Sequence, residues 1–526
     1  MTPQQRALVQ ATRPQRPPRT LLRDLARATG LGLHGDGATE VTGVSLSSQR
    51  ILAGDVYAAL PGSRVHGIEY ATTAVEEGAV AILTDQAGID RIRPGSPVLG
   101  GVPILVADDP RARLGAVAAA VYGDPATAMR TIGVTGTQGK TTTTRLIEGA
   151  LQHAGRRAGV IGTVGTRVAG RDIKTTLTTP EAPDLHALFA VMRESLVECC
   201  AMEVSSHALA RGRVDGVVFG VAVFLNLGRD HLDFHLDMED YYQAKASLFR
   251  ADHSRRALIN IDDEYGRRLA EETAGRGLPV RTFSLDGSLF SRADWRARDI
   301  ELGPDGSRFT LIGPKTKAEV VCPLPGGFNV SNAVAAVAAC VEAGYDVGEI
   351  AAGLAQVEGV PGRLERVRPP AGAEAPYAVI VDYAHKPDAV EAAIRALRPL
   401  TSGRVIVVIG AGGDRDTGKR PIMGEIAARL ADLVVVTDDN PRSEDPAEIR
   451  RQVMAGTRGG RAEVLEVGDR QEAIATAMAR AQAGDIVLVA GKGHETGQEV
   501  AGTVHPFDDR VVVRELFGAV GKNDAS

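Results

Sequence analysis

The stretch GVTGTQGKTTTT, residues 133–144, constrains the fold of this chain more than any other part of the sequence. It runs from a short apolar segment into glycines, a lysine and four threonines, and a helical pattern follows. Glycines let backbone N–H groups turn toward an anion, and the first turn of a helix adds positive potential. Lys140 has the reach to contact the β- and γ-phosphates of a nucleotide, and the hydroxyl of Thr141 can ligate Mg²⁺. The stretch therefore predicts a strand, a phosphate-binding loop and a helix in an α/β domain.

The match to the longer phosphate-loop pattern is incomplete, because Val134 stands where that pattern has a glycine. Only the shorter G-x-x-G-K-T of residues 136–141 is present. A turn that is rich in glycine and threonine by chance is the alternative. The apolar pattern before the loop and the helical pattern after it favour phosphate binding.

The length and charge of the chain limit its organisation and its partners. At 526 residues it is too long for one core and corresponds to about three domains. Hydrophobic residues make up 44% and charged residues 24%, which is typical of a water-soluble globular protein. The net charge is −6 and no long basic stripe occurs, so we expect neither a nucleic acid nor a membrane surface as a partner.

The N-terminus and the cysteines indicate a cytoplasmic protein. Residues 1–18 are polar and rich in proline and arginine, so we predict a disordered leader and no signal peptide. No run of 18 apolar residues follows. The four cysteines form no C-x-x-C pair and lack metal-site spacing, so we expect them to be reduced and buried; they are Cys199, Cys200, Cys322 and Cys340.

Strand and helix patterns divide the rest of the chain into three α/β segments, with predicted boundaries at 19–127, 128–362 and 363–526. In the first, GDVYAALPG predicts a strand and a turn, and YATTAVEEGAVAILTD predicts a helix that leads into a strand. The third repeats strand, loop and helix, with helix starts at Pro387, Lys419 and the pair Asp445-Pro446. Such repeats predict a parallel sheet with functional loops at the carboxyl ends of its strands.

Charged side chains follow several of the predicted strands. Glu203 and His231 come after apolar runs in the second segment, where carboxylate and imidazole groups can hold Mg²⁺ beside a phosphate loop. Lys245, inside the helical pattern YYQAKASLF, is by default a surface lysine. In the third segment Arg415 and Arg442 lie at strand-end loops, and two guanidinium groups in one crevice suit a ligand with carboxylates. Solvated loop charge is the alternative for these two arginines.

The chain resembles the Mur ligase family of bacterial cell-wall synthesis over nearly its whole length past residue 18. The resemblance rests on ten motifs in the family's order, which are GTQGKTTT, EVSSHAL, NLGRDHLDFH, YYQAK, GGFNVSNAVAA, VPGRLE, DYAHKPDA, GGDRDTGKRPIM, DDNPR and GKGHE. It implies an α/β protein of three domains. The N-terminal domain binds the UDP moiety, a central domain with a P-loop ATPase-like parallel sheet binds ATP, and a C-terminal domain with a Rossmann-like sheet binds the incoming amino acid.

The resemblance also implies roles for individual residues. Those for the UDP-sugar-peptide are Leu46, Ser48, Ser63, Arg64, Val65, Thr178, Thr179, Ser205, Arg211 and Arg213. Those for ATP are Gly136, Thr137, Gln138, Gly139, Lys140, Thr141, Thr142, Asn329, Asn332, Arg363 and Asp382. Those for magnesium are Thr141, Glu203, His231 and a carbamylated Lys245, and the catalytic residues are Lys140, His231 and Lys245. Those for the amino acid are Arg415, Asp439, Asn440, Pro441, Arg442, Gly491 and Glu495.

The implied reaction is ATP-dependent ligation through an acyl phosphate, by a monomer that adds a third residue to UDP-N-acetylmuramoyl-L-alanyl-D-glutamate. The motif DNPR at Asp439–Arg442 implies diaminopimelate as the amino acid. Arg442 can bind its second carboxylate with two hydrogen bonds, and Asn440 can bind nearby. Lysine would leave Arg442 without a partner, which typically costs about 2–5 kcal/mol.

Five positions depart from the residues common in the family. They are Gln49 for arginine, Leu177 and Gln138 for asparagine, Arg211 for glutamine and Lys386 for threonine. Three alternatives stand beside diaminopimelate ligation: the same reaction with lysine or ornithine, a folylpolyglutamate synthetase-like ligase, and a nucleotide-dependent switch. The motifs SLSSQRILAGDVYAALPG and DNPR argue against the second. The lack of an N-K-x-D motif argues against the third.

Overall fold

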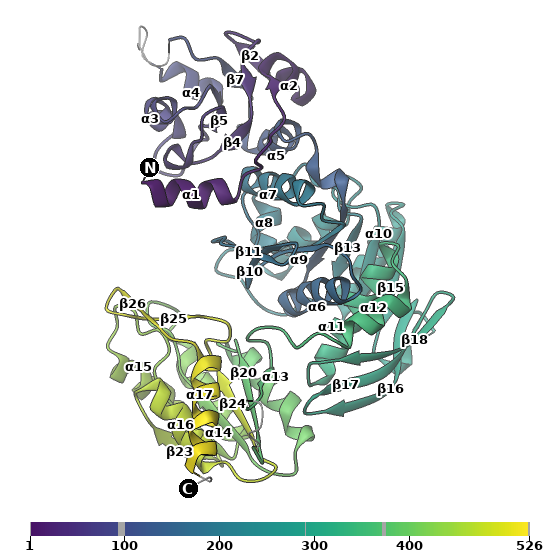
Figure 1. The fold of residues 1–526 in the computed structure, drawn as a ribbon, viewed down its shortest axis with the longest axis vertical. Helices are drawn as coiled ribbons and strands as arrows, with labels where there is room; N and C mark the ends of the chain where they lie inside the picture. Colours follow the sequence, from purple (N-terminus) through teal and green to yellow (C-terminus); the bar gives the residue numbers. More distant parts are fainter. Residues whose placement is uncertain (1, 93–99, 290, 371–374, 524–526) are drawn as a thin grey trace. The chain divides into compact units, whose positions relative to one another are not determined.

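The computed structural model describes residues 2–92, 100–289, 291–370 and 375–523 (Figure 1). The chain forms two compact units. The first comprises Met1–Arg296, Ile312–Ala318 and Val334–Gly353, and the second comprises Ala297–Leu311, Glu319–Ala333 and Leu354–Ser526. The phosphate loop lies in the first unit, and the predicted amino-acid loops lie in the second.

The prediction of a disordered leader over residues 1–18 is wrong for residues 3–11, because helix α1 spans Pro3–Ala11. Thr2 caps this helix, since its hydroxyl accepts from the Gln5 N–H at 3.2 Å and the Gln5 side chain accepts from the Thr2 N–H at 3.0 Å. This reciprocal pair satisfies two amides that a helix start leaves open, and proline is favourable at the first position. Composition suggested disorder, but the local capping chemistry specifies a helix.

A five-stranded sheet forms the N-terminal part of the first unit, in the order β2-β7-β6-β5-β4. Strands β4 to β7 are parallel, and β2 pairs antiparallel with β7. The predicted strand in GDVYAALPG is confirmed as β5, and the predicted helix and strand that follow are confirmed as α3 and β6. The elements are β1 (Thr20–Leu21), α2 (Leu22–Thr29), β2 (Gly32–His34), β3 (Glu40–Val41), β4 (Gly43–Ser45), β5 (Asp55–Ala58), α3 (Ala71–Glu76), β6 (Ala81–Thr84), α4 (Gln86–Asp90), β7 (Ile104–Val106) and α5 (Pro110–Val121).

The central sheet of the first unit runs β11-β10-β9-β12-β8-β13-β14-β15 and continues into β16. The seven strands β9, β12, β8, β13, β14, β15 and β16, neighbours in this order, are parallel, as predicted. Strands β10 and β11 are antiparallel additions at the β9 edge. Its elements are β8 (Arg130–Thr135), α6 (Lys140–His153), β9 (Ala158–Gly162), β10 (Gly165–Val168), β11 (Arg171–Ile173), α7 (Ala182–Glu194), β12 (Cys199–Glu203), α8 (Ser206–Ala210), β13 (Val221–Phe224), α9 (Met238–Ala246), β14 (Ala257–Asn260), α10 (Glu264–Gly275), β15 (Val280–Ser284) and β16 (Trp295–Gly303). The chain then forms β17 (Gly306–Gly313), β18 (Thr316–Cys322), α11 (Gly327–Glu342) and α12 (Val347–Leu354).

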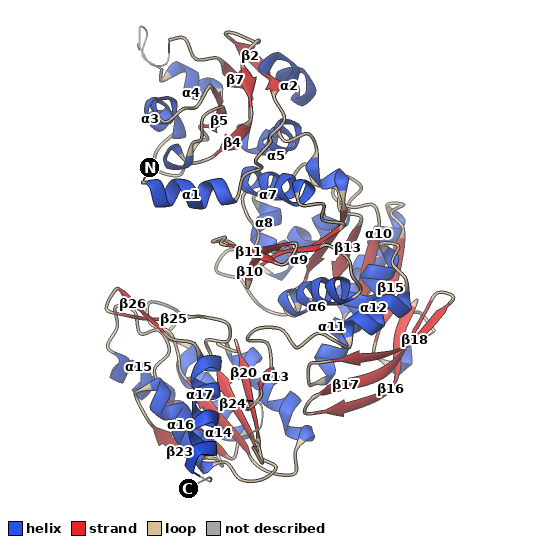
Figure 2. Ribbon diagram, viewed as in Figure 1, coloured by secondary structure: helices blue, strands red, loops and turns tan. Residues whose placement is uncertain are grey.

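The second unit contains a six-stranded sheet in the order β19-β20-β24-β21-β22-β23 (Figure 2). Five strands are parallel, which confirms the Rossmann-like prediction, and β19 is antiparallel at the edge. Alternate side chains of β21 enter opposite cores, since Val407 packs with α13, α14 and α15 whereas Ile406 and Val408 pack with α16 and α17. The elements are β19 (Glu365–Val367), β20 (Ala378–Asp382), α13 (Pro387–Leu397), β21 (Val405–Ile409), α14 (Lys419–Leu430), β22 (Leu433–Val436), α15 (Pro446–Gly456), β23 (Glu463–Glu466), α16 (Arg470–Arg480), β24 (Ile486–Ala490), β25 (Gly497–Val500), β26 (Thr503–Pro506) and α17 (Asp509–Asn523).

The cysteines and the helices bear on two further predictions. All four cysteines are free and buried, as expected. Burial raises the pKa of the Cys199 and Cys322 thiols to about 12. Among the residues that the structure describes, no helix is both long and apolar enough to cross a bilayer.

Candidate active site

The predicted strand, loop and helix around the phosphate loop are confirmed. Strand β8 ends at Thr135, the loop follows, and α6 begins at Lys140. Gly136 has φ +154° and Gly139 has φ +85°, which side chains other than that of glycine rarely allow. The loop thus delivers the first-turn amides of α6, which have no intrahelical acceptor, to the carboxyl edge of the sheet.

Asn226, which follows β13, supports the loop from the neighbouring strand. The N–H of Gln138 donates to the Asn226 side-chain oxygen at 2.9 Å, and the Asn226 amide donates to the Gln138 carbonyl at 3.2 Å. The N–H of Thr137 donates to the Asn226 carbonyl at 3.0 Å. Sequence reasoning missed this residue, although an asparagine two positions after a buried strand was a visible signal.

Two lysines converge on the loop. The Lys140 amine donates to the carbonyls of Gly136 at 2.8 Å and Thr137 at 3.0 Å. The Lys245 amine, on α9, donates to the same Gly136 carbonyl at 2.9 Å. Lys245 is 1% exposed, so the default interpretation of a surface lysine is wrong. Burial, and secondly repulsion by Lys140, lower the pKa of Lys245 well below its usual value.

Glu203 ends β12, next to the phosphate-loop strand, and lies among three of the predicted substrate residues. Its carboxylate accepts from the N–H of Thr163 at 2.8 Å and from the Thr163 hydroxyl at 3.1 Å. The Thr163 hydroxyl also contacts that of Thr178 at 3.1 Å. The Thr179 hydroxyl donates to the Glu203 carbonyl at 2.8 Å and lies 3.4 Å from that of Ser205. The structure therefore brings the predicted metal carboxylate and the predicted peptide contacts together.

His231 lies on the loop after β13 and has φ +55°, which is uncommon for a residue other than glycine. Its ring lies 4.8 Å from that of His207 and 6.1 Å from that of Tyr241, measured between centroids. Desolvation, and secondly the charge of His235, lower the pKa of His207. Sequence reasoning did not single out His207. Because β12 and β13 flank β8, Glu203, His231 and Thr141 all follow neighbouring strands at the same sheet edge.

The donor set at this edge fits magnesium only in combination with a phosphate ligand. In the described part of the chain, no group of three or more His, Cys, Asp or Glu side chains is placed to hold a metal. Mg²⁺ characteristically binds one or two carboxylates together with phosphate oxygens and water. One carboxylate, Glu203, and one threonine hydroxyl, Thr141, suit such a site.

The predicted UDP contacts lie after two adjacent parallel strands. Leu46 and Ser48 follow β4, and the exposed turn Ser63–Val65 follows β5, which pairs with β4. The departures Gln49 and Leu177 are both exposed. Farther along the chain, the Arg213 guanidinium donates to the Thr179 carbonyl at 3.3 Å and pairs with Glu181 at 2.8 Å, and that of Arg211 lies 5.2 Å from the centre of the Phe234 ring.

The remaining predicted ATP residues belong to the second unit. The Asn332 amide donates to the Asn329 side chain at 3.0 Å. The Arg363 guanidinium lies 4.7 Å from the centre of the Tyr383 ring. The Asp382 carboxylate accepts from the Leu364 N–H at 2.7 Å, and burial raises its pKa. Asn329 thus contacts Asn332, and Arg363 and Asp382 interact through their charges.

The predicted amino-acid loops follow β21, β22 and β24, and β21 lies between the other two strands. The Asn440 amide donates to the Glu495 carboxylate at 2.8 Å, and Lys492 donates to the Asn440 side-chain oxygen at 2.9 Å. A Cβ on Gly491 would lie 2.4 Å from the Asp439 carboxylate, so only glycine fits there. Sequence reasoning missed Lys492, a fully buried residue of the GKGHE loop.

Arg442 is not left without partners, which corrects the expected cost of binding lysine. Its guanidinium donates to the Gly413 carbonyl at 2.6 Å and lies 3.5 Å from the Glu499 carboxylate on β25. Both partners belong to the protein itself and are present without any bound amino acid. The penalty is therefore smaller than the 2–5 kcal/mol typical of a stranded buried charge. Arg415, on the loop after β21, is exposed.

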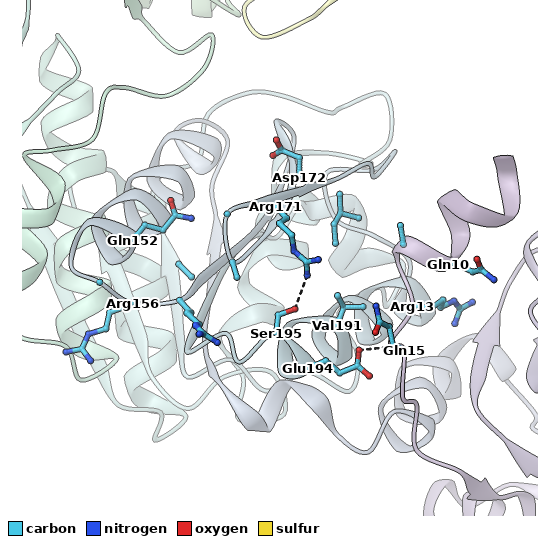
Figure 3. A pocket seen from close by; sticks show the side chains of 17 residues that line it. Gln10, Arg13, Gln15, Gln152, Arg156, Arg171, Asp172, Val191, Glu194 and Ser195 are labelled. Atoms are coloured by element: carbon cyan, nitrogen blue, oxygen red, sulfur yellow. Dashed lines mark hydrogen bonds between the residues drawn. The ribbon is translucent and has the colours of Figure 1, made fainter.

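A cavity of about 930 Å³ in the first unit lies apart from these residues (Figure 3). It is lined by the ends of α1, α6 and α7 and by β11, and no predicted site residue lines it. Its α6 residue, Gln152, lies about 18 Å along the helix from Lys140 at 1.5 Å per residue. The Arg171 guanidinium there donates to the Ser195 hydroxyl at 3.3 Å. The cavity is therefore no part of the phosphate site.

Known proteins resemble the chain along almost its full length. Profiles of the Mur ligase family match its catalytic domain to residues 40–122, its middle domain to 134–340 and its glutamate ligase domain to 362–493. The UDP-N-acetylmuramoyl-L-alanyl-D-glutamate–2,6-diaminopimelate ligase of Streptomyces avermitilis is 54% identical and covers 91% of this chain and 92% of its own. The ligase of the same name from Streptomyces coelicolor is 52% identical, with 96% and 98% covered.

Solved structures agree with these sequence relatives. A UDP-N-acetylmuramoyl-L-alanyl-D-glutamate–2,6-diaminopimelate ligase superposes with a TM-score of 0.68 at 32% identity, over 96% of this chain and 100% of its own. A folylpolyglutamate synthase of Mycobacterium tuberculosis gives 0.58 at 21% identity over 77% of this chain and 95% of its own, which shows a shared fold alone. With all three profiles matched in order and relatives more than half identical, the chain belongs to the Mur ligase family and has its three-domain α/β fold.

Proposed function

We propose that this protein is the ATP-dependent ligase that adds diaminopimelate to UDP-N-acetylmuramoyl-L-alanyl-D-glutamate during peptidoglycan precursor synthesis, in the cytoplasm. The observation that carries the proposal is the agreement between two independent features. Relatives 52% and 54% identical over nearly the whole chain bear the name of this activity. Here the DNPR and GKGHE loops are joined by the Asn440–Glu495 hydrogen bond, with Arg442 on the first of them.

In the first chemical step a γ-carboxylate of the D-glutamyl residue attacks the γ-phosphate of ATP, giving an acyl phosphate and ADP. Two anions meet in this step, so the protein contributes chiefly positive charge and positioning. The loop amides and the first turn of α6 bind the phosphates. The Lys140 amine, which lies across the loop on the Gly136 and Thr137 carbonyls, exchanges those partners for phosphate oxygens.

In the second step the amine of the incoming amino acid attacks the acyl carbonyl, and inorganic phosphate leaves. Arg415 is proposed to bind the carboxylate at the reacting end of the amino acid. Arg442 and Asn440 are proposed to bind the distal carboxylate, with Gly491 and Glu495 at the distal amine. Because Asn440 and Glu495 are already hydrogen-bonded to each other, these two side chains are held in place before the substrate arrives.

Magnesium is proposed to be held by Thr141, Glu203 and His231, together with a carbamate on Lys245. When bound, it neutralises charge on the transferring phosphoryl group. Lys245 suits carbamylation because only an unprotonated amine reacts with CO₂, and burial lowers its pKa. For a lysine with its usual pKa, losing the proton at pH 7 costs about 4.6 kcal/mol, and burial lowers that cost here.

A folylpolyglutamate synthetase-like activity has less support. Three solved folylpolyglutamate synthase structures resemble only 72–78% of this chain and share 16–21% identity with it. The N-terminal sheet that carries Leu46 and Ser48 is matched instead by the Mur ligase catalytic-domain profile. Ligation of lysine or ornithine uses the same machinery and is a question of substrate preference.

The proposal is tested by ADP release from purified protein supplied with ATP and Mg²⁺. ADP should accumulate only when the UDP-linked dipeptide and diaminopimelate are both present. Release that requires a folate and glutamate instead would identify the alternative ligase. Release with ATP alone would identify an ATPase or a switch.

A further inference from the structure

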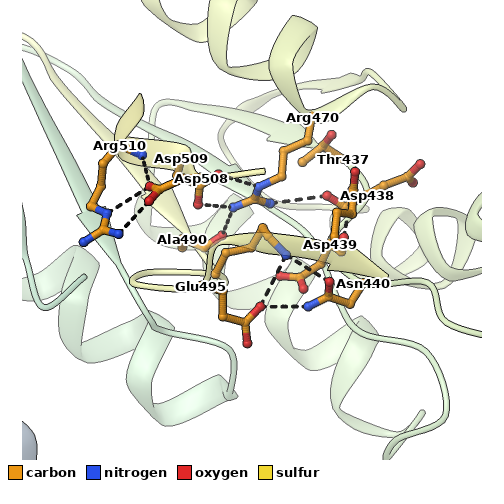
Figure 4. Close-up of polar contacts among 12 residues, drawn as sticks. Thr437, Asp438, Asp439, Asn440, Arg470, Ala490, Glu495, Asp508, Asp509 and Arg510 are labelled. Atoms are coloured by element: carbon orange, nitrogen blue, oxygen red, sulfur yellow. Dashed lines mark hydrogen bonds and ion pairs between the residues drawn. The ribbon is translucent and has the colours of Figure 1, made fainter. Parts of the chain in front are cut away.

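The guanidinium of Arg470 lies fully buried in the second unit, at the base of both predicted amino-acid loops (Figure 4). It forms two hydrogen bonds of 2.8 Å with the carboxylate of Asp509, which is also fully buried. It also donates to two main-chain carbonyls, at 3.3 Å to that of Asp438 and at 3.0 Å to that of Ala490. A planar, two-pronged pair of this kind fixes the orientation of the guanidinium.

Those two carbonyls belong to the residues directly before the two loops, which we call the loop roots. Asp438 directly precedes the DNPR loop, Asp439–Arg442, and Ala490 is the last residue of β24, directly before Gly491. One guanidinium therefore ties together the points at which both loops leave the sheet. Arg470 is the first residue of α16 and Asp509 is the first of α17, so the C-terminal helix anchors the arginine that holds both loops.

Side chains of the two loops are also hydrogen-bonded to each other. Lys492 contacts the Asn440 side chain at 2.9 Å and the Glu495 carboxylate at 3.3 Å, and Asn440 donates to Glu495 at 2.8 Å. These hydrogen bonds require the two loops to leave the sheet at positions that bring Asn440 within reach of Lys492 and Glu495. The geometry of Asn440 and Glu495 thus depends on the link at the roots.

We propose that Arg470 and Asp509 are positioning residues for amino-acid selection, holding the DNPR and GKGHE loops at the spacing that receives the distal end of the amino acid. The inference rests on the proposed function, since it assigns these loops to the amino acid. If the pair only stabilises the fold, its loss lowers thermal stability and affects all three substrates alike.

The test is steady-state kinetics of Asp509→Asn, with Asp508→Asn as the matched control. Asp508 is the preceding residue and pairs with Arg510 at 2.6 Å, without contact to either loop root (Figure 4). In Asp509→Asn the KM for diaminopimelate should rise about tenfold or more, a change of about 1.4 kcal/mol. The KM values for ATP and the UDP-linked dipeptide should change less than about threefold. Asp508→Asn should resemble the wild type in all three.

Arg470 variants give a second, independent measurement. Arg470→Lys keeps the positive charge but cannot form the paired hydrogen bonds of a guanidinium. It should therefore recover part of the affinity for diaminopimelate that Arg470→Met loses. If single variants fold poorly, the double variant Arg470→Met/Asp509→Leu replaces the buried pair with apolar side chains, a change that buried pairs often tolerate. It should fold and still show the raised KM for diaminopimelate.

An unchanged KM for diaminopimelate in folded Asp509→Asn or in the double variant would overturn the inference, as would an equal rise for all three substrates. Failure of the proposed function has a different signature. In that case the wild type itself releases no ADP in response to diaminopimelate.

Discussion

The side-chain amine of Lys245 donates a 2.9 Å hydrogen bond to the carbonyl oxygen of Gly136, the first glycine of the phosphate loop. A fully buried amine is thereby placed on the main chain of the predicted phosphate loop. Lys140 donates to the same carbonyl at 2.8 Å. Two ammonium groups this close repel each other, so the buried lysine favours its neutral form.

The first prediction is that Lys245 reacts with CO₂. The unprotonated fraction of an amine grows as pH rises toward its pKa, and the lowered pKa moves that rise to lower pH. Enzyme equilibrated with ¹³C-labelled bicarbonate and Mg²⁺ should show one carbamate carbon signal by NMR, and Lys245→Ala should lack it.

Acetate supplies the functional counterpart of that measurement. It should partly restore activity to Lys245→Ala, because it replaces the missing carboxylate, but should restore none to Lys140→Ala. A free amine alone in the magnesium-loaded, bicarbonate-equilibrated wild type would contradict the prediction.

The second prediction concerns Lys140, whose charge is proposed to meet the charge that grows on the transferring phosphoryl group. Lys140→Ala should lower kcat by several orders of magnitude with little change in thermal stability. Lys317→Ala, at an exposed position on β18, is the control and should keep wild-type activity. Retention of more than about a tenth of the activity by Lys140→Ala, a loss below roughly 1.4 kcal/mol, would exclude the assigned role.

The third prediction is that Glu499 competes with the amino acid for Arg442. The pair is partly exposed and contributes at most about 1 kcal/mol, so Glu499→Gln should lower the KM for diaminopimelate by up to about fivefold. The KM for lysine should not change. Arg442→Ala should lose the preference for diaminopimelate altogether.

The control for this variant is Glu472→Gln, at an exposed position on α16. This control removes one carboxylate from the second unit, and that carboxylate lies outside the DNPR and GKGHE loops. A KM for diaminopimelate that rises in Glu499→Gln would show that Glu499 supports the site instead of competing for it.

The fourth prediction concerns the thiols. Burial raises the pKa of Cys199 and Cys322 to about 12, so few thiolates form below that pH. Iodoacetamide at pH 8 should leave the folded protein unlabelled and active and should alkylate all four cysteines after denaturation. Rapid labelling of native protein with loss of activity would contradict the burial of these residues.

Local patterns allowed much of the fold and site to be predicted. The phosphate loop and the helix starts at Pro387 and Lys419 are encoded by a few adjacent residues, and these predictions are confirmed. Helix α1 was missed because proline and arginine content outweighed the capping pair of Thr2 and Gln5.

The missed residues of the site share a different cause. Arg470 and Asp509 stand at the first positions of two helices, where charged residues are ordinary, and 39 positions separate them in sequence. Nothing in the local pattern marks them as buried or as partners. The same holds for Lys492, because burial of a polar residue is decided by distant parts of the chain. Asn440 and Lys245 were predicted as site residues from the resemblance alone.

The central claim is that the chain ligates diaminopimelate, and kcat/KM measured side by side for four amino acids tests it most directly. The four are meso-diaminopimelate, LL-diaminopimelate, lysine and ornithine, each with saturating ATP and UDP-linked dipeptide. One diaminopimelate isomer should exceed lysine and ornithine by at least about tenfold, which corresponds to about 1.4 kcal/mol. Lysine or ornithine equal to the better diaminopimelate isomer would contradict the claim.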